Sequence, residues 1–310
     1  MANEIFGSAV AGGGTGLAAT GGMVESVLSD LIVQAVYDAT DLTAVMTRIP
    51  WEARGGLALD VTIDPAPGAF AAVAEGADVA ANSAYTTSKF SMTLARKARR
   101  YQWSDLIGMD GGKIQLPEVA NKLVQGISLT MTDALTALFP AVAGSVGSAS
   151  LAMSVDAFYD ACFALNSNAA NGPYKMVLHP TQINEFRSGL RSESGAVQWH
   201  ESTFETLRSK GPGYQGEFQG VEVYSTSGVT NAGGAYIGAI MADGAFAYTF
   251  GDPRQISGAV GTDNIYFINE IILVEKLRHA LSSSTTLVGN IWTSVVEAQD
   301  ALACRVLSTT

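Results

Sequence analysis

The sequence predicts an α+β protein, and three stretches carry that prediction. In the first, two runs of alternating apolar and polar residues, 57–63 and 90–94, can pair as an antiparallel ribbon. In the second, residues 117–139, apolar side chains recur every three or four positions, as in one long helix. In the third, residues 155–190, helical patterns alternate with a short apolar strand, and strand-like runs follow. Helices and strands are therefore both expected, in separate blocks.

Composition indicates a protein that packs against other molecules. The chain has 310 residues, enough for about two domains, and is 47% apolar. Only 15% of it is charged, against roughly 25% in typical soluble domains. This deficit suggests that partners cover much of the surface. The net charge of −11 argues against a protein that reads nucleic-acid sequence, because such a protein needs a basic surface.

Targeting signals are not expected. The first basic residue is Arg48, so no positively charged region opens a signal peptide. No uninterrupted apolar run reaches the ~18 residues of a membrane helix. Cys162 and Cys304 are too few for a disulfide framework and are interpreted as reduced, buried thiols. The sequence therefore predicts a cytoplasmic protein without a membrane partner.

The first 50 residues are interpreted as an arm followed by a helix. Residues 1–22 are rich in glycine and alanine, and 14–19 fit the loose G-x-G-x-x-A dinucleotide pattern. A Rossmann fold would place an acidic residue at the end of a second strand about 20 positions later, but that region is helical in pattern. A flexible arm is the better interpretation, and a nucleotide-binding α/β enzyme with its site at 12–16 is the alternative. Apolar residues at helical spacing predict a helix over 23–47, which Pro50 ends.

The ribbon belongs to an extended loop over 51–105. Its two strands are separated by 65–88, which has no periodicity and far exceeds the roughly 2–5 residues of a usual hairpin loop. A two-stranded ribbon is only marginally stable alone in water. We therefore expect a neighbouring copy of the same protein to cover it.

Four cationic residues follow the ribbon. They are a weak nucleic-acid patch, since only Tyr101 and Trp103 stand nearby to stack on bases. They are expected instead to pair with acidic residues, within the chain or on a neighbouring subunit. The four residues are Arg96, Lys97, Arg99 and Arg100.

The remaining elements are predicted from periodicity and from turn residues. Pro117 suits the first turn of the long helix, and Pro140 ends it. Residues 211–220 are predicted to be a loop. Two further helices are predicted at 155–165 and 181–190, and strands at 174–178, 221–224, 236–241, 245–250, 266–273 and 287–296.

No pattern typical of catalysis or metal binding is present in the sequence. There is no G-x-S-x-G elbow, no H-E-x-x-H pair and no Walker loop. The histidines His179, His200 and His279 fall on different predicted elements, and Asp156 and Asp160 lack a third ligand nearby. We therefore expect no catalytic, cofactor-binding or metal-binding residues.

The order of these parts resembles the major capsid proteins of tailed bacteriophages, which share the Hong Kong 97-type fold. Residues 74–78 followed by 89–94 are similar to the extended loop of that family, and 117–139 to its spine helix. Residues 176–182 are similar to the strand-to-helix step of its axial domain. Later strands of that domain resemble 220–224 and 239–250.

The resemblance implies a fold with five parts. These are an N-terminal arm and helix (1–50), an extended β-hairpin loop (51–105), a peripheral domain with a long spine helix (106–150), an axial domain (151–262) and a return to the peripheral domain (263–310). Because only about 50 residues precede the ribbon, a separate scaffold protein is expected rather than an attached scaffolding segment.

The resemblance also implies a structural protein of the virion, assembled in the bacterial host cytoplasm. Copies would form homo-pentamers and homo-hexamers of an icosahedral shell that encloses DNA without sequence-specific binding. A portal and decoration proteins are the further partners, no cofactor is expected, and another self-assembling phage protein of the tail or sheath is the alternative. The candidate inter-subunit contacts are Glu75, Asp78, Lys89, Arg96, Lys97, Arg99 and Arg100.

Overall fold

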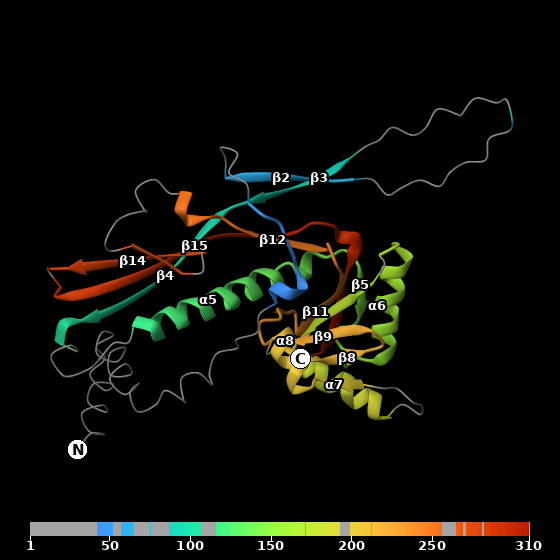
Figure 1. The fold of residues 1–310 in the computed structure, drawn as a ribbon. Helices are drawn as coiled ribbons and strands as arrows, with labels where there is room; N and C mark the ends of the chain where they lie inside the picture. Colours follow the sequence, from blue (N-terminus) through green and yellow to red (C-terminus); the bar gives the residue numbers. More distant parts are fainter. Residues whose placement is uncertain are drawn as a thin grey trace, which may run out of the picture.

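Two β-sheets joined by one long helix make up the body of the molecule (Figure 1). The structure is a computed structural model and describes residues 42–51, 57–64, 75, 87–106, 116–170, 172–192, 199–211, 213–255, 265–268, 271–280 and 282–309. The predicted mixture of helices and strands is confirmed. The nucleotide-type pattern at 12–16 and most of the predicted first helix lie outside the described residues.

The first sheet has six strands and is organised around β15 (Ser284–Glu297). One side of β15 pairs with β14 (Ile272–His279) and then with β12 (Phe246–Phe250), and β4 (Ala95–Ser104) pairs antiparallel along it from Ser104 to Ala95. β13 (Ile265–Ile268) and β1 (Thr47–Arg48) complete the sheet at its two ends. Segments nearly 200 positions apart in sequence thus lie side by side.

The second sheet has eight strands in the order β5-β16-β11-β6-β9-β8-β7, with β10 beside β11. Helices α6 (Val155–Ser167) and α7 (Pro180–Ser192) cover one face, where Phe158, Phe186 and Phe218 meet in tilted or edge-on contacts. The short helix α8 (Phe204–Lys210) contacts β8. The strands are β5 (Ser145–Gly147), β6 (Tyr174–Leu178), β7 (Trp199–Glu201), β8 (Tyr214–Phe218), β9 (Val221–Ser225), β10 (Asn231–Ala232), β11 (Ala235–Ala242) and β16 (Ala303–Thr309).

Helix α5 (Leu116–Thr136) connects the two sheets and confirms the predicted long helix. Its Met131 and Leu135 are fully buried in a core that also contains Met241 of β11 and Phe246 of β12. The 3₁₀-helices η2 (Thr43–Val45) and η3 (Phe139–Ala141) close this core, with Leu42 and Phe139 fully buried. Farther toward its N-terminus, α5 packs Leu123 against β14 and β15.

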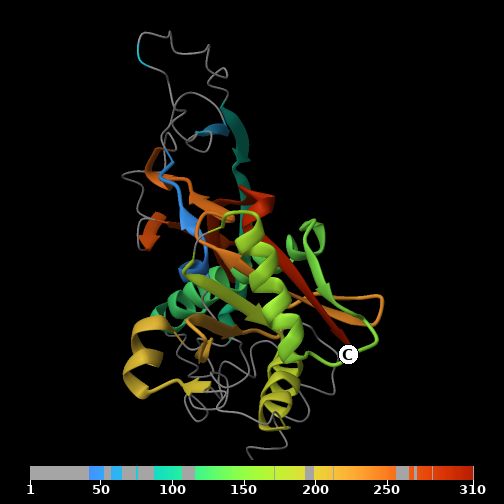
Figure 2. The same ribbon diagram turned by 90° about the vertical axis from the view of Figure 1, so that its right-hand side faces the viewer.

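The ribbon of β2 (Ala58–Ile63) and β3 (Ser88–Thr93) forms a sheet of its own. Its strands pair antiparallel from Ala58–Thr93 to Ile63–Ser88, as the alternation predicts. Figures 1 and 2 show the ribbon standing off the body, and most of its side chains are exposed or half-buried. Met92 is the exception, because it is fully buried at the base of the ribbon.

Three expectations about local structure are wrong. The helix predicted to run to Thr47 does not reach it, since Thr47 and Arg48 form β1 beside β12. The loop predicted over 211–220 contains β8, whose glycine at 216 sits at a bulge and conceals the alternation of Tyr214 and Phe218. The single strand predicted over 266–273 is two antiparallel strands, β13 and β14. The polar pair Asn269 and Glu270 stands between the two apolar strands, and the single-strand prediction did not take it as a turn signal.

Gly289 of β15 should be required for the contact between α5 and the sheet. A Cβ at this position would lie 2.7 Å from Cδ2 of Leu123, whose side chain is buried. We expect Gly289→Val to lower the free energy of unfolding by about 1–3 kcal/mol through overpacking, measured by urea denaturation of the subunit. Leu123→Ala in the same chain removes the clashing atoms, so the double variant should lose less than the sum of the two single losses. Additive losses would contradict the contact.

Candidate assembly surface

Strand β4 places the four cationic residues on two faces of the six-stranded sheet. Side chains alternate along a strand, so Arg96 and Arg100 point to one face and Lys97 and Arg99 to the other. Among the described strands, β4 pairs with β15 alone. The cations therefore lie along an outer strand of the sheet, where another molecule can reach them.

Arg96 and Arg100 have polar partners within the chain. The guanidinium of Arg96 donates two hydrogen bonds to Oδ1 of the buried Asn290, at 2.9 and 2.6 Å. Arg100 donates to Gln102 and, at 3.5 Å, to the hydroxyl of Thr286. None of these partners is an anion, so both positive charges remain uncompensated by these contacts.

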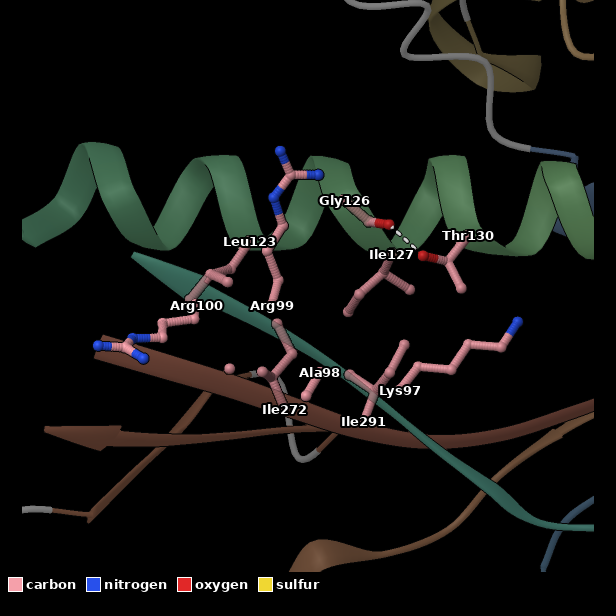
Figure 3. Close-up of a pocket in the computed structure, with 11 residues that line it drawn as sticks. Lys97, Ala98, Arg99, Arg100, Leu123, Gly126, Ile127, Thr130, Ile272 and Ile291 are labelled. Atoms are coloured by element: carbon pink, nitrogen blue, oxygen red, sulfur yellow. Dashed lines mark hydrogen bonds between the residues drawn. The ribbon is translucent and has the colours of Figure 1, made fainter. Parts of the chain in front are cut away.

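Lys97 and Arg99 face helix α5 across a cavity of about 350 Å³ (Figure 3). The cavity lining is largely apolar, and the Arg99 side chain crosses α5 beside Gly126, where a Cβ would still be 4.0 Å from Arg99 Cδ. The Arg99 guanidinium lies 5.7 Å from the centre of the Tyr101 ring, a cation–π distance. No acidic side chain within the described residues forms an ion pair with Lys97 or Arg99. The apolar lining consists of Leu123 and Ile127 on the α5 side and of Ile272 and Ile291 on the sheet side.

The remaining predicted contact residues lie in the ribbon and its loop. Lys89 of β3 forms an exposed ion pair with Asp60 of β2 at 3.0 Å, and this hydrogen bond lowers the pKa of Asp60. Glu75 is exposed, and Asp78 lies outside the described residues. The structure thus brings the four β4 residues together and keeps Lys89 on a separate sheet.

Several exposed apolar side chains were not singled out from the sequence. Phe204 and Leu106 are 81% and 73% exposed, and Phe163 is 72% exposed. A sequence signal existed for Phe163, because it falls off the buried stripe of its helix. The ion pair of Arg278 with Asp105, at 2.7 Å, had no signal, since its members are far apart in sequence.

Comparison with known proteins identifies the fold. No family model matches the sequence, and the comparison with curated proteins gives no match. Solved structures do match over nearly the whole chain. The capsid of the native GTA particle is 12% identical, with a TM-score of 0.61 over 89% of this chain and 92% of the other. The capsid structure of Cyanophage P-SCSP1u is 10% identical, with a TM-score of 0.58 over 86% and 87%.

This chain has the Hong Kong 97-type capsid fold. The same fold occurs in the SrpI encapsulin complex of Synechococcus elongatus, which is 11% identical with a TM-score of 0.55 over 88% of both chains. Helix α5 lies where the long helix was predicted, and β2 and β3 form the predicted ribbon. The eight-stranded sheet carries the strand-to-helix step predicted at 176–182.

That step is built around a buried polar side chain. Gln182 is fully buried, and its Oε1 accepts from the backbone N–H of His179 at 3.0 Å. His179 stacks on Tyr236 at 3.8 Å between ring centres, and its Nδ1 accepts from the backbone N–H of Thr181 at 3.2 Å. Burial lowers the pKa of His179. In this chain His179 therefore serves in packing and in the start of α7.

The described part of the chain contains no arrangement typical of an active site. His200 and His279 are exposed on different sheets, and Asp156 and Asp160 are exposed on α6. No group of three or more potential metal ligands occurs among the described residues. Burial raises the pKa of Cys162 and of Cys304 to about 11, which disfavours the thiolate form. No helix in the described ranges has the length and apolar character needed to cross a membrane.

Among the described residues, Glu297 at the end of β15 has a carboxyl group with a strongly raised pKa. Burial is the main cause, followed by the hydrogen bond and negative charge of Asp300, and together they raise its pKa to about 7. Its Oε1 is buried without a hydrogen-bond partner among the described residues. Asp300 itself accepts from the backbone N–H of Ala143 at 2.8 Å, so it is held in place beside Glu297.

Stability of the subunit should fall between pH 5 and pH 8 because of Glu297. Its pKa is about 7 in the fold against an ordinary value of 4.5, so the folded chain binds the proton more tightly than the unfolded one. The resulting stabilisation is complete below about pH 4.5 and is lost as the pH rises through about 7. Thermal unfolding of wild type and Glu297→Gln at both pH values tests this. The drop in melting temperature should be smaller in the variant, and equal drops would contradict the assignment.

Proposed function

We propose that this chain is a major capsid protein, which self-assembles through pentamers and hexamers into the icosahedral shell that encloses phage DNA. One observation carries the proposal: the chain matches capsid structures over nearly its whole length. The proposed role is structural, without catalytic turnover, cofactor or membrane. The protein would be a component of the virion, assembled in the bacterial host cytoplasm.

The exposed ribbon supports self-assembly. A two-stranded ribbon gains little stability in water unless something packs on it. In the described residues, β2 and β3 pair only with each other, and the adjoining Leu57 is 66% exposed. A neighbouring copy in a shell would cover this surface at every position. The ribbon would then be stabilised in the assembly, whereas in the free chain it is exposed to water.

The cationic residues of β4 are proposed to bind acidic groups of neighbouring subunits. With a net charge of −11 per chain, copies repel one another, and local cations at the contacts offset that repulsion. Glu75 and Asp78 of the loop are the proposed acidic partners, and Lys89 is a further contact. Lys97 and Arg99 are the strongest of these candidates, because Arg96 and Arg100 already bond to side chains of their own chain.

The proposed division of the chain follows the capsid fold. Residues 1–50 form the arm and its helix, 51–105 the extended loop, 106–150 and 263–310 the peripheral domain, and 151–262 the axial domain. A separate scaffold protein, a portal and decoration proteins are the proposed further partners. The acidic chain suits a wall that encloses DNA without binding its sequence.

Electron microscopy of the purified protein, with and without a scaffold protein, tests the proposal. Closed icosahedral particles that contain DNA after phage infection are the expected result. Open tubes would favour the tail or sheath alternative, and a small oligomer that binds nucleotide would favour the enzyme. A closed shell around a protein cargo would favour a compartment of the encapsulin kind. A concentrated sample that sediments only as a monomer, even with scaffold present, would overturn self-assembly.

The double variant Lys97→Glu, Arg99→Glu should assemble poorly while the subunit stays folded. Removing one partner of a desolvated interfacial charge pair costs about 2–5 kcal/mol, and charge reversal adds repulsion. The measurement is the yield of particles by velocity sedimentation, with circular dichroism to check the fold. Lys97→Arg, Arg99→Lys keeps both charges and is the matched control, which should assemble. Normal empty shells from the reversed variant that package DNA poorly would show that these residues face DNA.

A further inference from the structure

Helix α6 presents an apolar and acidic face to solvent. Tyr159 and Phe163 lie one turn apart on it and are 47% and 72% exposed. Asp156 and Asp160 flank them and are exposed, with no ion pair to either within the described residues. The helix carries no basic residue. Neither aromatic ring stabilises the subunit by burial to the extent that a core residue does, so this face is available to a partner.

A second exposed phenylalanine lies on the other face of the same sheet. Phe204 begins helix α8 and is 81% exposed, and Arg208 follows one turn later with an exposed side chain. Lys210 anchors α8 through Glu222 and lies 5.2 Å from the centre of the Tyr214 ring. The acidic Glu205 stands in the first turn, so the positive charge of α8 is gathered in its last turn.

The two helices belong to opposite faces of the eight-stranded sheet. Phe158 packs α6 against Phe218 and Val223, in the core on one face. Tyr214, over which α8 is anchored, belongs to the core on the other face. Figure 1 shows α6 and α8 on the two sides of this sheet. One subunit therefore presents exposed aromatic and acidic side chains of α6 on one side of the sheet. On the other side, α8 presents the exposed Phe204 and, one turn later, the exposed Arg208.

We propose that α6 of one copy docks head to tail against α8 of the next copy. This inference rests on the proposed self-assembly and names the surfaces that form each ring. Contacts between two different patches generate closed rings when the rotation between neighbours closes. Asp156 and Asp160 would meet Arg208, and Tyr159 and Phe163 would pack beside Phe204. A symmetric contact of α6 with α6 would instead bring four carboxylates together without a cation, which is repulsive.

Reversing one charge at a time tests the pairing. Asp160→Arg and Arg208→Asp should each weaken association between subunits by about 30-fold or more, measured by analytical ultracentrifugation. The two changes in one chain restore opposite charges across the contact and should recover most of the association. As a matched control, Asp160→Arg combined with Arg191→Asp on α7 should not recover it, although the net charge is the same.

Mixing the two single variants gives a sharper result. Asp160→Arg chains and Arg208→Asp chains can contact each other through either interface but cannot contact their own kind. Rings from the mixture must alternate, so native mass spectrometry should find six-membered rings with three copies of each and no five-membered rings. Closed shells that need pentamers should be absent from the mixture, while wild type forms them.

Each outcome bears on the inference separately from the proposed function. If wild-type chains form no rings or shells under any condition, self-assembly is wrong and this contact falls with it. If wild type assembles but the single variants assemble equally well, or the combined variant shows no recovery, the α6–α8 contact alone is wrong. Five-membered rings in the mixture would overturn it as well.

Thermal unfolding of the variants should match wild type, because Asp160, Phe163, Phe204 and Arg208 are exposed. The change of Phe163→Ala together with Phe204→Ala gives a second test that alters no charge.

Discussion

Burial of one side of α5 is the constraint on which the rest of the structure depends. A helix of 21 residues has little stability of its own in water, so its formation relies on packing. Met131 and Leu135 are fully buried between the two sheets, and each such side chain contributes about 1.5–3 kcal/mol of apolar burial. Because the same core holds Met241 and Phe246, it fixes the direction in which one sheet meets the other. Both sheets therefore share one buried core.

Strand β4 is an outer strand of the six-stranded sheet and pairs with β15. An unpaired strand edge can accept a strand from any other chain, and charged side chains restrict which chains it accepts. On β4, cationic side chains lie on both faces of the sheet. Arg96 and Arg100 are held by Asn290 and Thr286 on β15, while Lys97 and Arg99 border the cavity beside α5. The selectivity of the edge depends on the sheet that orders it.

The eight-stranded sheet combines a closely packed interior with exposed aromatic side chains on its helices. Its interior is satisfied by close packing of Phe158, Phe186 and Phe218 and by the buried Gln182. The exposed phenylalanines on α6 and α8 add nothing to that interior, and in a free chain they lower solubility. Exposed apolar side chains of this kind are typical of surfaces that bind a partner. The low fraction of charged residues is consistent with this, because a surface that becomes buried in an assembly does not need charged side chains to keep the protein soluble.

Periodicity in the sequence determined the elements whose two sides differ in environment. The ribbon strands alternate between Leu59, Val61 and their polar neighbours, so their pairing with each other could be predicted. Helix α5 carries an apolar stripe through Met131 and Leu135, so a long helix could be predicted there. The order of these elements also sufficed to suggest the capsid fold. The prediction failed in two places: the polar pair Asn269 and Glu270 between β13 and β14 was not taken as a turn, and the glycine at 216 concealed β8.

Only the tertiary structure decided which distant segments meet. The cationic run at 96–100 has no partner in its own neighbourhood, and its place on β4 beside residues 284–293 follows from long-range pairing with β15. The exposure of Phe163 and Phe204, and the opposite placement of α6 and α8, depend on which face of the sheet each helix covers. Local sequence fixes the period of a side-chain pattern, because the backbone repeat is local. It cannot fix the partner, because burial is a property of the whole fold.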